Sequence, residues 1–526
     1  QPTPPVRVSN GWLRGSVAHS GTHAHFLAIP YASLQSRFQA PGPEPTWSGV
    51  FEAVEEYIHC RQAFFLRGNV TSGTENCMIL NIYTPLTASP DKPLPVMVFF
   101  HGGGFFQRSA TRMIYGPEYL VSKGVVLVTV NYRLNVQGFL CLGIKEAPGN
   151  AGMKDQVAAL KWVQRNIKAF GGDPDNVTIF GESAGGISVS LHVLSPMTKG
   201  LFHKAIAQSG SSLSSFVVQY RPVHRANLLA NTMGFDSQDP REIYDFLMKQ
   251  SDIDLIANRV PREEGTIALS EMLFTPCVEK KIEGEEPFLT EFPYNLLNKG
   301  KFNKVPMMLG ANTEEGLYLM SLDLEDMISK VSYDKAIPDD LSFPSIEERK
   351  RVVDEAQKIY MGDDNVITKQ TKVKLSKFYG EPYFNYPALE ETELLLKSTN
   401  QSIFHYLFAY DGNRNLPKKD ISRELSSVKG ATHADELFYL FSQQIVPSSF
   451  ETKMINTMTT MWTNFAKYGN PTPDFIESDI RWPPVTREDK RILRIDKEVS
   501  TIPLWYSNSL RFWRKVYSKY RKKFNK

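Results

Sequence analysis

The sequence predicts an α/β fold, with a mainly parallel central sheet that helices cover on both faces. Apolar, β-branched runs with the length of buried strands recur along the chain. Segments with helical spacing lie between these runs, and this alternation is typical of parallel sheets covered on both faces. Glycine-rich turns follow several of the runs directly, at the sheet edge where open α/β sheets bind ligands.

The expected elements follow the chain in order. Residues 1–60 are rich in proline, glycine and aromatic residues, which favours short strands and loops. Apolar runs predict buried strands at 94–100, 125–130, 177–180, 305–309 and 403–410. Helical spacing predicts helices at 152–167 and from 184 to about 194.

Two irregular, charged and mostly helical blocks interrupt this alternation, at about 211–300 and 318–400. No long Gly/Ser-rich or Pro-rich tract, fixed repeat or low-complexity block divides the chain of 526 residues. We therefore expect one domain over residues 1–526. The two blocks are expected to be helical insertions that cap the ligand-binding edge of the sheet.

Composition excludes several classes of protein. A hydrophobic content of 42% and a charged content of 22% are ordinary for a globular chain. The net charge of +3 is small, so no nucleic-acid partner is expected. No apolar run approaches the length of a transmembrane segment. The chain begins with Gln1 instead of Met, from which we expect a processed or trimmed N-terminus.

The cysteines leave two alternatives open. They are Cys60, Cys77, Cys141 and Cys277, and their spacing fits no zinc pattern. Cys60 and Cys77 are close enough in sequence to form a disulfide that closes a small loop. In the chain-entropy model such a bond stabilises the folded state by about 3 kcal/mol. The alternative is four free thiols in a cytosolic enzyme.

Glycosylation motifs favour the secretory route. Asn69 and Asn400 each begin an Asn-x-Ser/Thr site in polar surroundings, and both are candidate acceptors. A third match at Asn176 leads into an expected core strand and is a poor acceptor. We therefore expect a secreted protein or one of the secretory pathway, with a cytoplasmic location as the alternative.

The last stretch, residues 510–526, predicts an amphipathic helix. Its apolar residues recur at three- and four-residue steps, and most of the other positions are Lys or Arg. We prefer the interpretation of a helix that lies on the body of the protein with a solvated basic face. The alternative is contact with an acidic membrane surface or an acidic partner.

A Gly-x-Ser-x-Gly motif at 181–185 stands between an expected strand and an expected helix. In this context the tight turn lifts the hydroxyl of Ser183 clear of the sheet, and the helix N-terminus offers free N–H groups. The motif alone is also compatible with an ordinary Gly/Ser turn. A serine nucleophile needs a base, an acid and an oxyanion hole as well.

Candidates for these roles follow later strands. Glu315 follows the strand at 305–309, and His433 lies in a loop after the strand at 403–410, so both are expected at the same sheet edge as Ser183. The order Ser, acid, His is that of α/β-hydrolases. The alternative for Glu315 is a helix-capping role, which Thr313 or Glu314 could equally fill. The alternative for His433 is a loop histidine without a functional role.

The oxyanion hole has a candidate in the glycine run 102–104 after the first expected strand. Glycines let backbone N–H groups approach a developing negative charge, and the N–H of Ala184 completes the set. A phosphate-binding loop is the alternative, but no Gly-Lys-Ser/Thr follows the run.

Over nearly its whole length the chain resembles the type-B carboxylesterase/cholinesterase family, most closely the insect carboxylesterases. The matching runs are 37–38, 74–81, 101–105, 131–134, 150–156, 170–174, 181–186, 208–210, 310–316 and 430–433. The resemblance implies an α/β-hydrolase fold with a capped active-site gorge. It also implies a serine carboxylic ester hydrolase that needs no metal or cofactor.

Site residues carry over from the resemblance by position. The implied triad is Ser183, Glu315 and His433, with Glu315 chosen over Glu314 because the family's acid directly precedes the glycine. The implied oxyanion donors are Gly103, Gly104 and Ala184. Ser209 and Glu182 are expected to lie behind the triad, Ser209 as a hydroxyl near the acid.

The resemblance also implies covalent and ionic features of the fold. Cys60–Cys77 matches the family's first disulfide, whereas the second family disulfide has no counterpart, so Cys141 and Cys277 are expected to be free. Structural ion pairs are expected between Arg37 and Glu75 and between Arg133 and Asp155.

The implied substrates are small to medium hydrophobic esters, such as xenobiotic, pheromone or hormone esters, with a role in detoxification or clearance. Organophosphates or carbamates are the expected inhibitors. The loop closed by the first two cysteines lacks the Trp with which cholinesterases bind choline, so choline esters are not expected. Glu182 stands where the juvenile hormone esterase branch usually has Gln. Arg108 and Asn135 stand where the family often has Gly, and we expect neither to touch the triad. The rival hypotheses are an ester-sequestering or non-catalytic binding protein on the same fold, and an interfacial lipase.

Overall fold

A large mixed sheet is the centre of the computed structural model, which describes residues 1–64, 70–444, 446 and 451–524. Its strands are β3 (Ser16–Val17), β4 (His23–Pro30), β8 (Ile79–Pro85), β9 (Leu94–Phe100), β10 (Val126–Val130), β11 (Gly172–Glu182), β12 (Lys204–Gln208), β13 (Met307–Asn312), β14 (Ile403–Phe408), β15 (Arg491–Ile495) and β16 (Ser500–Pro503). Small sheets consist of β1 (Val6–Val8), β2 (Gly11–Arg14) and β5 (Val50–Glu52), and of β6 (Gln62–Ala63) and β7 (Thr71–Ser72).

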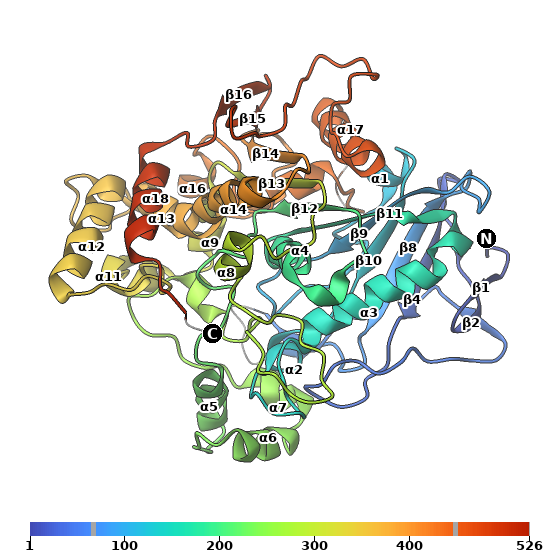
Figure 1. Cartoon of the computed structure of the whole chain (residues 1–526), viewed down its shortest axis with the longest axis horizontal. Coiled ribbons are helices and arrows are strands. Elements are labelled where there is room, and N and C mark those ends of the chain that lie inside the picture. The colour runs from blue at the N-terminus through green and yellow to red at the C-terminus, as the bar shows by residue number, and fades with distance from the viewer. Residues whose placement is uncertain (65–69, 445, 447–450, 525–526) are drawn as a thin grey trace.

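The helices lie around this sheet (Figure 1). The α-helices are α1 (Glu118–Val121), α2 (Asn135–Phe139), α3 (Ala151–Asn166), α4 (Ala184–Leu194), α5 (Pro222–Thr232), α6 (Pro240–Met248), α7 (Asp252–Ala257), α8 (Pro293–Asn298), α9 (Glu315–Ser321), α10 (Glu325–Ser329), α11 (Tyr333–Ala336), α12 (Ile346–Met361), α13 (Lys372–Gly380), α14 (Tyr386–Ser398), α15 (Leu416–Lys419), α16 (Arg423–Ser426), α17 (Thr452–Tyr468) and α18 (Asn508–Tyr520). Shorter turns are the 3₁₀ helices η1 (Ile167–Phe170), η2 (Pro196–Thr198), η3 (Ala268–Glu271) and η5 (Asp435–Tyr439) and the π-helix η4 (Glu381–Asn385).

The strand order explains where a site can form. In the described residues the order across the sheet is β16-β15-β14-β13-β12-β11-β9-β10-β8-β4-β3. The run from β15 to β10 is parallel throughout, and antiparallel strands flank it on both sides. Parallel strands end at one common edge, so the loops after β9, β11, β13 and β14 meet there.

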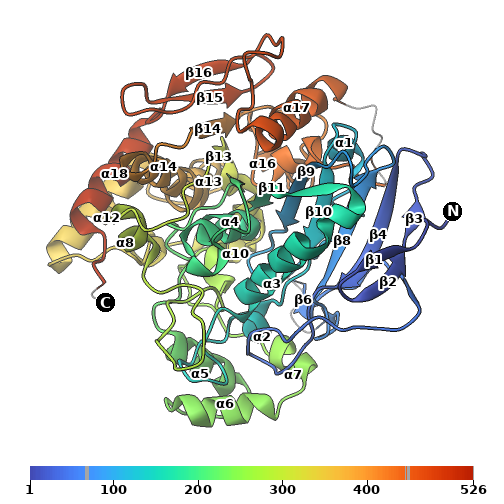
Figure 2. The ribbon, with the colours of Figure 1, turned by 45° about the vertical axis from the view of Figure 1, so that its right-hand side comes forward.

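Both faces of the parallel strands are buried against helices, as Figure 2 shows. Val98 and Ile179 belong to one apolar cluster with side chains of α3 and α4. Phe99 and Phe180, the next residues along the same strands, belong to a second cluster with Trp462 of α17. Successive strand residues point to opposite faces, which is why these strands are apolar without alternation.

The predicted fold class is confirmed. The apolar run 94–100 coincides with β9, and the other predicted strands match β10, β11, β13 and β14 to within a few residues, apart from an earlier start of β11. The helix predicted at 152–167 is α3 with its boundaries shifted by one residue. These segments are long and strongly periodic, so sequence pattern alone locates them.

The expectation that Cys141 and Cys277 are free is wrong. They form a disulfide across 136 residues, with their Cα atoms 6.7 Å apart, in addition to the expected Cys60–Cys77 bond. Cys141 follows α2, and Cys277 lies in the first helical block. Asn150 holds the second segment in place, because its side-chain amide donates to the carbonyl of Cys277 at 2.7 Å and its Oδ1 accepts the N–H of Cys277 at 2.9 Å. Partners so far apart in sequence carry no local signal.

The C-terminal helix α18 packs on the body of the protein. Leu510, Trp513 and Tyr517 are buried, as the predicted apolar stripe requires. The Trp513 indole donates to the Tyr360 hydroxyl at 2.8 Å, and the Tyr517 hydroxyl donates to Asp340 at 2.6 Å. The basic residues occupy the opposite, exposed side of the helix.

Candidate active site

Ser183 stands at the sharp turn between β11 and α4. Its backbone has φ 57° and ψ −120°, a conformation that residues with a side chain rarely adopt and that clusters at functional sites. The turn requires glycine at position 185, because a Cβ atom on Gly185 would lie 1.8 Å from the carbonyl oxygen of Phe100 on β9. Strand and helix therefore nearly touch, and Ser183 lines a pocket at the N-terminus of α4.

His433 and Glu315 form a buried pair at the same sheet edge. His433 Nδ1 lies 2.9 Å from Glu315 Oε2, and the two residues are 5% and 1% exposed. The other carboxylate oxygen accepts the N–H of Asn312 at 3.0 Å and the hydroxyl of Ser209. Because a carboxylate only accepts, Nδ1 carries the proton of a neutral imidazole and Nε2 keeps its lone pair.

The neighbouring carboxylate, Glu314, has a different partner. It forms an ion pair with Lys377 at 2.6 Å. Glu315 is the first residue of α9, whereas Glu314 precedes the helix. One step along the chain turns the two side chains to different surroundings, and the geometry favours Glu315 as the partner of His433.

Glu182 contacts the other ring nitrogen of the histidine. Its Oε2 lies 3.1 Å from His433 Nε2, in an electrostatic contact without hydrogen-bond geometry. Burial raises the pKa of Glu182. Burial lowers the pKa of His433, but the carboxylates of Glu182 and Glu315 outweigh it and raise that pKa above its ordinary value. The imidazole and the two carboxylates therefore titrate as a coupled group.

A third buried acid, Glu436, was not predicted from the sequence. It accepts hydrogen bonds at 3.0 Å from the side-chain amides of Gln208 and Asn312, and Gln208 in turn accepts the indole N–H of Trp462 at 3.0 Å. Burial raises the pKa of Glu436 to about 7. A signal was present in the sequence, since Glu436 follows His433 by three residues and Gln208 directly precedes Ser209.

The glycine run after β9 has the backbone geometry of an oxyanion hole. Gly103 has φ 108° and Gly104 has φ 64°, and both values lie in the left-handed region. In the part of the chain that the structure describes, neither N–H group donates a hydrogen bond to another residue. The N–H of Ala184 opens α4 beside Ser183. These three residues line the same pocket as Ser183 and His433.

This pocket encloses about 90 Å³ and has both apolar and polar lining residues. Side chains from both helical blocks form an apolar wall, and they are Phe216, Ala268, Leu269, Met272, Leu319, Leu322 and Phe384. Phe384 lies in the π-helix η4, and its ring centroid is 4.7 Å from that of His433. The polar lining residues away from the triad are Gln107, Arg108, Tyr115, Glu182 and Tyr318. Arg108 therefore belongs to the pocket. Among the described residues, no hydrogen bond or ion pair joins it to Ser183, Glu315 or His433.

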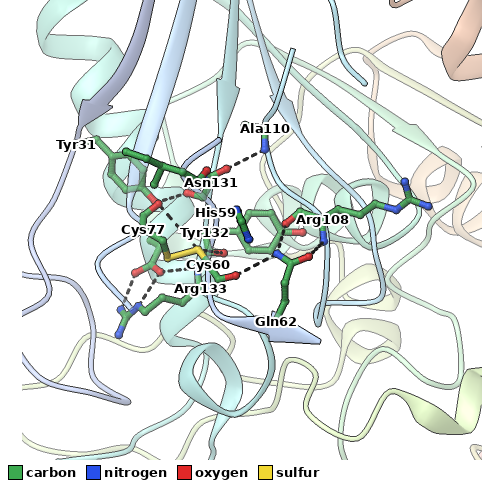
Figure 3. The surroundings of a disulfide bond; sticks show 12 residues. Tyr31, His59, Cys60, Gln62, Cys77, Arg108, Ala110, Asn131, Tyr132 and Arg133 are labelled. Atoms are coloured by element: carbon green, nitrogen blue, oxygen red, sulfur yellow. Dashed lines mark hydrogen bonds and ion pairs between the residues drawn. A yellow bond between two sulfur atoms is a disulfide. The ribbon is translucent and has the colours of Figure 1, made fainter. Parts of the chain in front are cut away.

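The Cys60–Cys77 disulfide lies close to Gln62 and to the segment around Arg108, as Figure 3 shows. Gln62 follows Cys60, and its side-chain amide donates to the carbonyls of Cys60 and Arg108 at 3.1 and 2.9 Å. Its Oε1 accepts the N–H of Arg108 at 2.8 Å. The disulfide loop thus fixes the backbone of the segment that follows the glycine run.

The expected ion pairs are present around this loop. Arg37 lies 2.7 Å from Glu75, and Arg133 lies 2.6 Å from Asp155. The Arg133–Asp155 pair is almost completely buried and forms two side-chain hydrogen bonds. Both pairs hold the fold together at a distance from the reacting groups.

The glycosylation candidates differ in what the structure describes of them. Asn69 lies outside the described residues. Asn400 is exposed in the loop before β14. Asn176 is half-buried at β11, where its side-chain oxygen accepts a hydrogen bond from Lys204.

The described residues contain no helix both long and apolar enough for a membrane crossing. They also contain no cluster of three or more His, Cys, Asp or Glu side chains that could hold a metal ion.

Comparisons with known proteins agree with this geometry. The model of the carboxylesterase family matches residues 2–513. Esterase FE4 of Myzus persicae is 33% identical over 515 residues, which cover 94% of this chain and 89% of that protein. A juvenile hormone esterase of Tribolium castaneum is 33% identical over 509 residues, which cover 89% of this chain and 84% of that protein.

A solved structure is similar over the whole chain. The crystal structure of juvenile hormone esterase from Manduca sexta, with OTFP covalently attached, has a TM-score of 0.86 and 30% sequence identity. The alignment covers 98% of this chain and 99% of that chain.

Proposed function

The chain belongs to the carboxylesterase family, and on that premise we propose that it is a serine carboxylic ester hydrolase whose triad is Ser183, His433 and Glu315. The observation that carries the assignment is the buried pair of His433 and Glu315 in the pocket of Ser183. No metal or cofactor takes part in the proposed reaction.

The reaction proceeds through an acyl-enzyme. The Ser183 hydroxyl attacks the ester carbonyl, His433 Nε2 takes its proton, and the same proton returns to the leaving alcohol. Glu315 orients the imidazole through Nδ1 and stabilises the imidazolium that forms. Water then attacks the acyl-enzyme with His433 again as base. For this step and the first, the Glu182 side chain must move away from Nε2 so that the reacting oxygen can approach this nitrogen, while Nδ1 keeps its contact with Glu315.

The glycine turn stabilises the charge that each step creates. The N–H groups of Gly103, Gly104 and Ala184 are the proposed donors to the oxyanion of the tetrahedral intermediate. Loss of a single donor of this kind costs about 3–4 kcal/mol of transition-state stabilisation in other hydrolases.

The pocket favours small to medium hydrophobic esters. Its wall is apolar, and a volume of about 90 Å³ accommodates a short acyl or alcohol group next to Ser183. Relatives whose names give substrates include the juvenile hormone esterases and a pyrethroid hydrolase of Rattus norvegicus, 32% identical over 550 residues. Hormone, pheromone or xenobiotic esters are accordingly the proposed substrates, and detoxification or clearance is the proposed role.

Covalent labelling tests the assignment. An organophosphate or a carbamate should modify one serine, and peptide mass spectrometry should find the added group on Ser183. Modification of another serine would refute the assignment. Ser183→Ala should lower ester turnover by several orders of magnitude while the protein stays folded.

Two rival functions have separate tests. A burst of product followed by almost no steady turnover would indicate a protein that sequesters esters. An interfacial lipase would show a rise in rate above the micellar threshold of a long-chain ester. The apolar side of α18 is buried, so this helix offers a membrane surface only its basic side and a weak electrostatic attraction.

A secretory location is part of the proposal. Disulfides persist in oxidising compartments and are rare in the cytosol. Both disulfides, together with the exposed site at Asn400, support passage through the secretory pathway. Treatment with an endoglycosidase should lower the apparent mass of the protein purified from its natural source.

A further inference from the structure

Arg108 is a side chain that neither the sequence prediction nor the triad explains. It is the fourth residue after Gly104 and has φ 77°, so a long side chain occupies a left-handed position that suits glycine. Gln62 holds its backbone through two hydrogen bonds, at 2.8 and 2.9 Å. Figure 3 shows the side chain running away from the disulfide loop, and its end lines the pocket that contains Ser183.

The charge of Arg108 lacks a close counter-ion. A guanidinium stays protonated at every physiological pH. Its hydrogen-bond partners in the pocket are the hydroxyls of Tyr318, at 3.5 Å, and Tyr115, and none of the ion pairs among the described residues involves Arg108. Arg133 and Arg262 differ, because Arg133 pairs with Asp155 and Arg262 pairs with Asp323.

The groups around Arg108 leave most of its charge uncompensated. Burial raises the pKa of Tyr115 to about 12, so this phenol is neutral. The Glu182 carboxyl acts on Arg108 only from beyond ion-pair distance, because its close partner is His433 Nε2 at 3.1 Å. Arg108 is half-buried, and a cation partly removed from water without a counter-ion carries a cost in free energy that an anionic ligand offsets.

The pocket is therefore amphipathic. Apolar side chains such as Phe216 and Leu322 line it together with the cationic Arg108 and two tyrosines, Tyr115 and Tyr318. We propose that Arg108 binds an anionic group carried by the ester itself, so that the enzyme prefers esters with an apolar body and one carboxylate, sulfate or phosphate over neutral esters of the same shape. This inference rests on the proposed ester hydrolysis and names its substrate class.

The alternative role for Arg108 is internal. In that case the guanidinium would serve only as a distant counter-charge for Glu182. An internal role predicts no discrimination between anionic and neutral substrates, which makes the two roles separable by kinetics.

Matched ester pairs test the proposal with the purified enzyme. One pair places the charge on the acyl side: the mono-para-nitrophenyl ester of adipic acid and the corresponding ester of adipic monoamide. The other places it on the alcohol side: para-carboxyphenyl butyrate and para-carbamoylphenyl butyrate. Within each pair the shape is nearly constant, so the ratio of kcat/KM for the anionic ester to kcat/KM for the amide measures recognition of charge.

We expect the anionic ester of at least one pair to be preferred by about 10-fold or more, because a hydrogen bond between charged groups has that effect. Arg108→Gln should abolish most of the preference, and Arg108→Lys should retain part of it. Arg112 is the matched control, because it pairs with Glu56 away from the pocket, and Arg112→Gln should leave the ratio unchanged. The wild-type enzyme should also be inhibited about 10-fold more strongly by benzoate than by benzamide.

The inference is overturned if the amide esters are hydrolysed as well as the anionic ones, or if Arg108→Gln leaves the ratio as it was. The comparison of benzoate with benzamide needs no variant, so it tests the proposal even if Arg108→Gln does not fold. Equal inhibition by the two compounds would then overturn the proposal. Absence of turnover for every ester in the wild-type enzyme would instead contradict the proposed function, so the two failures are distinguishable.

Discussion

Glu182→Gln should move the acidic limb of the pH–rate profile to lower pH. The substitution keeps the shape of the side chain but removes a carboxylate that lies 3.1 Å from His433 Nε2. A negative neighbour stabilises the imidazolium and thereby raises the pKa of the histidine. His433 must be neutral to accept the proton of Ser183, so activity rises as pH passes through this pKa. Removal of the charge lowers the pKa and preserves activity at lower pH.

The size of the shift follows from the surroundings of the imidazole. The carboxylates hold the pKa of His433 at about 9, about 2.5 pH units above its ordinary value of 6.5, although burial acts in the opposite direction. The Coulomb interaction with Glu182 is the largest single contribution that raises this pKa, ahead of the separate Coulomb and hydrogen-bond contributions of Glu315. Loss of the largest contributor should move the limb by about 1 pH unit or more, which corresponds to about 1.4 kcal/mol per unit.

The assay is kcat/KM for a neutral para-nitrophenyl ester from about pH 5 to about pH 10, because this parameter reports the ionisation of the free enzyme. Glu436→Gln should cause a smaller shift in the same direction. Glu314→Gln is the matched control and should cause none, because Glu314 pairs with Lys377. A limb that stays in place or moves upward in Glu182→Gln would refute the electrostatic reasoning, whatever happens to the height of the profile.

Three further substitutions have outcomes fixed by contacts. Ser209→Ala removes a hydroxyl that donates to Glu315, the proposed acid of the triad, so kcat/KM for a neutral ester should fall about 10- to 100-fold. Ser212→Ala removes a hydroxyl that donates to Glu391 instead, and it should leave kcat/KM within about 3-fold. Gly185→Ala puts a Cβ atom 1.8 Å from a carbonyl oxygen of β9, so no folded protein should be recovered on expression; wild-type yields would contradict the close approach. Replacement of both Cys141 and Cys277 by alanine opens a loop of 136 residues and should lower the free energy of unfolding by about 2–5 kcal/mol in urea; an unchanged midpoint would show that the bond contributes nothing.

Sequence patterns predict the parallel core and the order of its loops well. The strand β9 and the helix α3 are long, periodic and flanked by clear turns, so local pattern suffices. The choice of Glu315 over Glu314 came from family position, and it agrees with the contacts that each carboxylate makes.

Other features depend on side-chain direction or on distant segments. The contact between Glu182 and His433 joins residues on different loops, and a sequence alone does not say which way either side chain turns. The disulfide of Cys141 joins segments brought together only by the folded insertion. The sequence shows that Arg108 replaces a glycine that is common in the family. Its position in the pocket depends on the local backbone turn, which a hydrogen bond from the Arg108 N–H to Gln62 stabilises.

The positions of the two disulfides in the chain also determine the order in which they can form while the polypeptide emerges from the ribosome. Cys60 and Cys77 can be joined by an oxidoreductase soon after synthesis begins, whereas Cys141 has to wait until residue 277 has left the exit tunnel. During that interval Cys141 is a free thiol, because its native partner Cys277 has not yet been released, and it can form a non-native disulfide. A nascent chain halted between these two points should therefore carry a closed N-terminal loop and a single alkylatable cysteine.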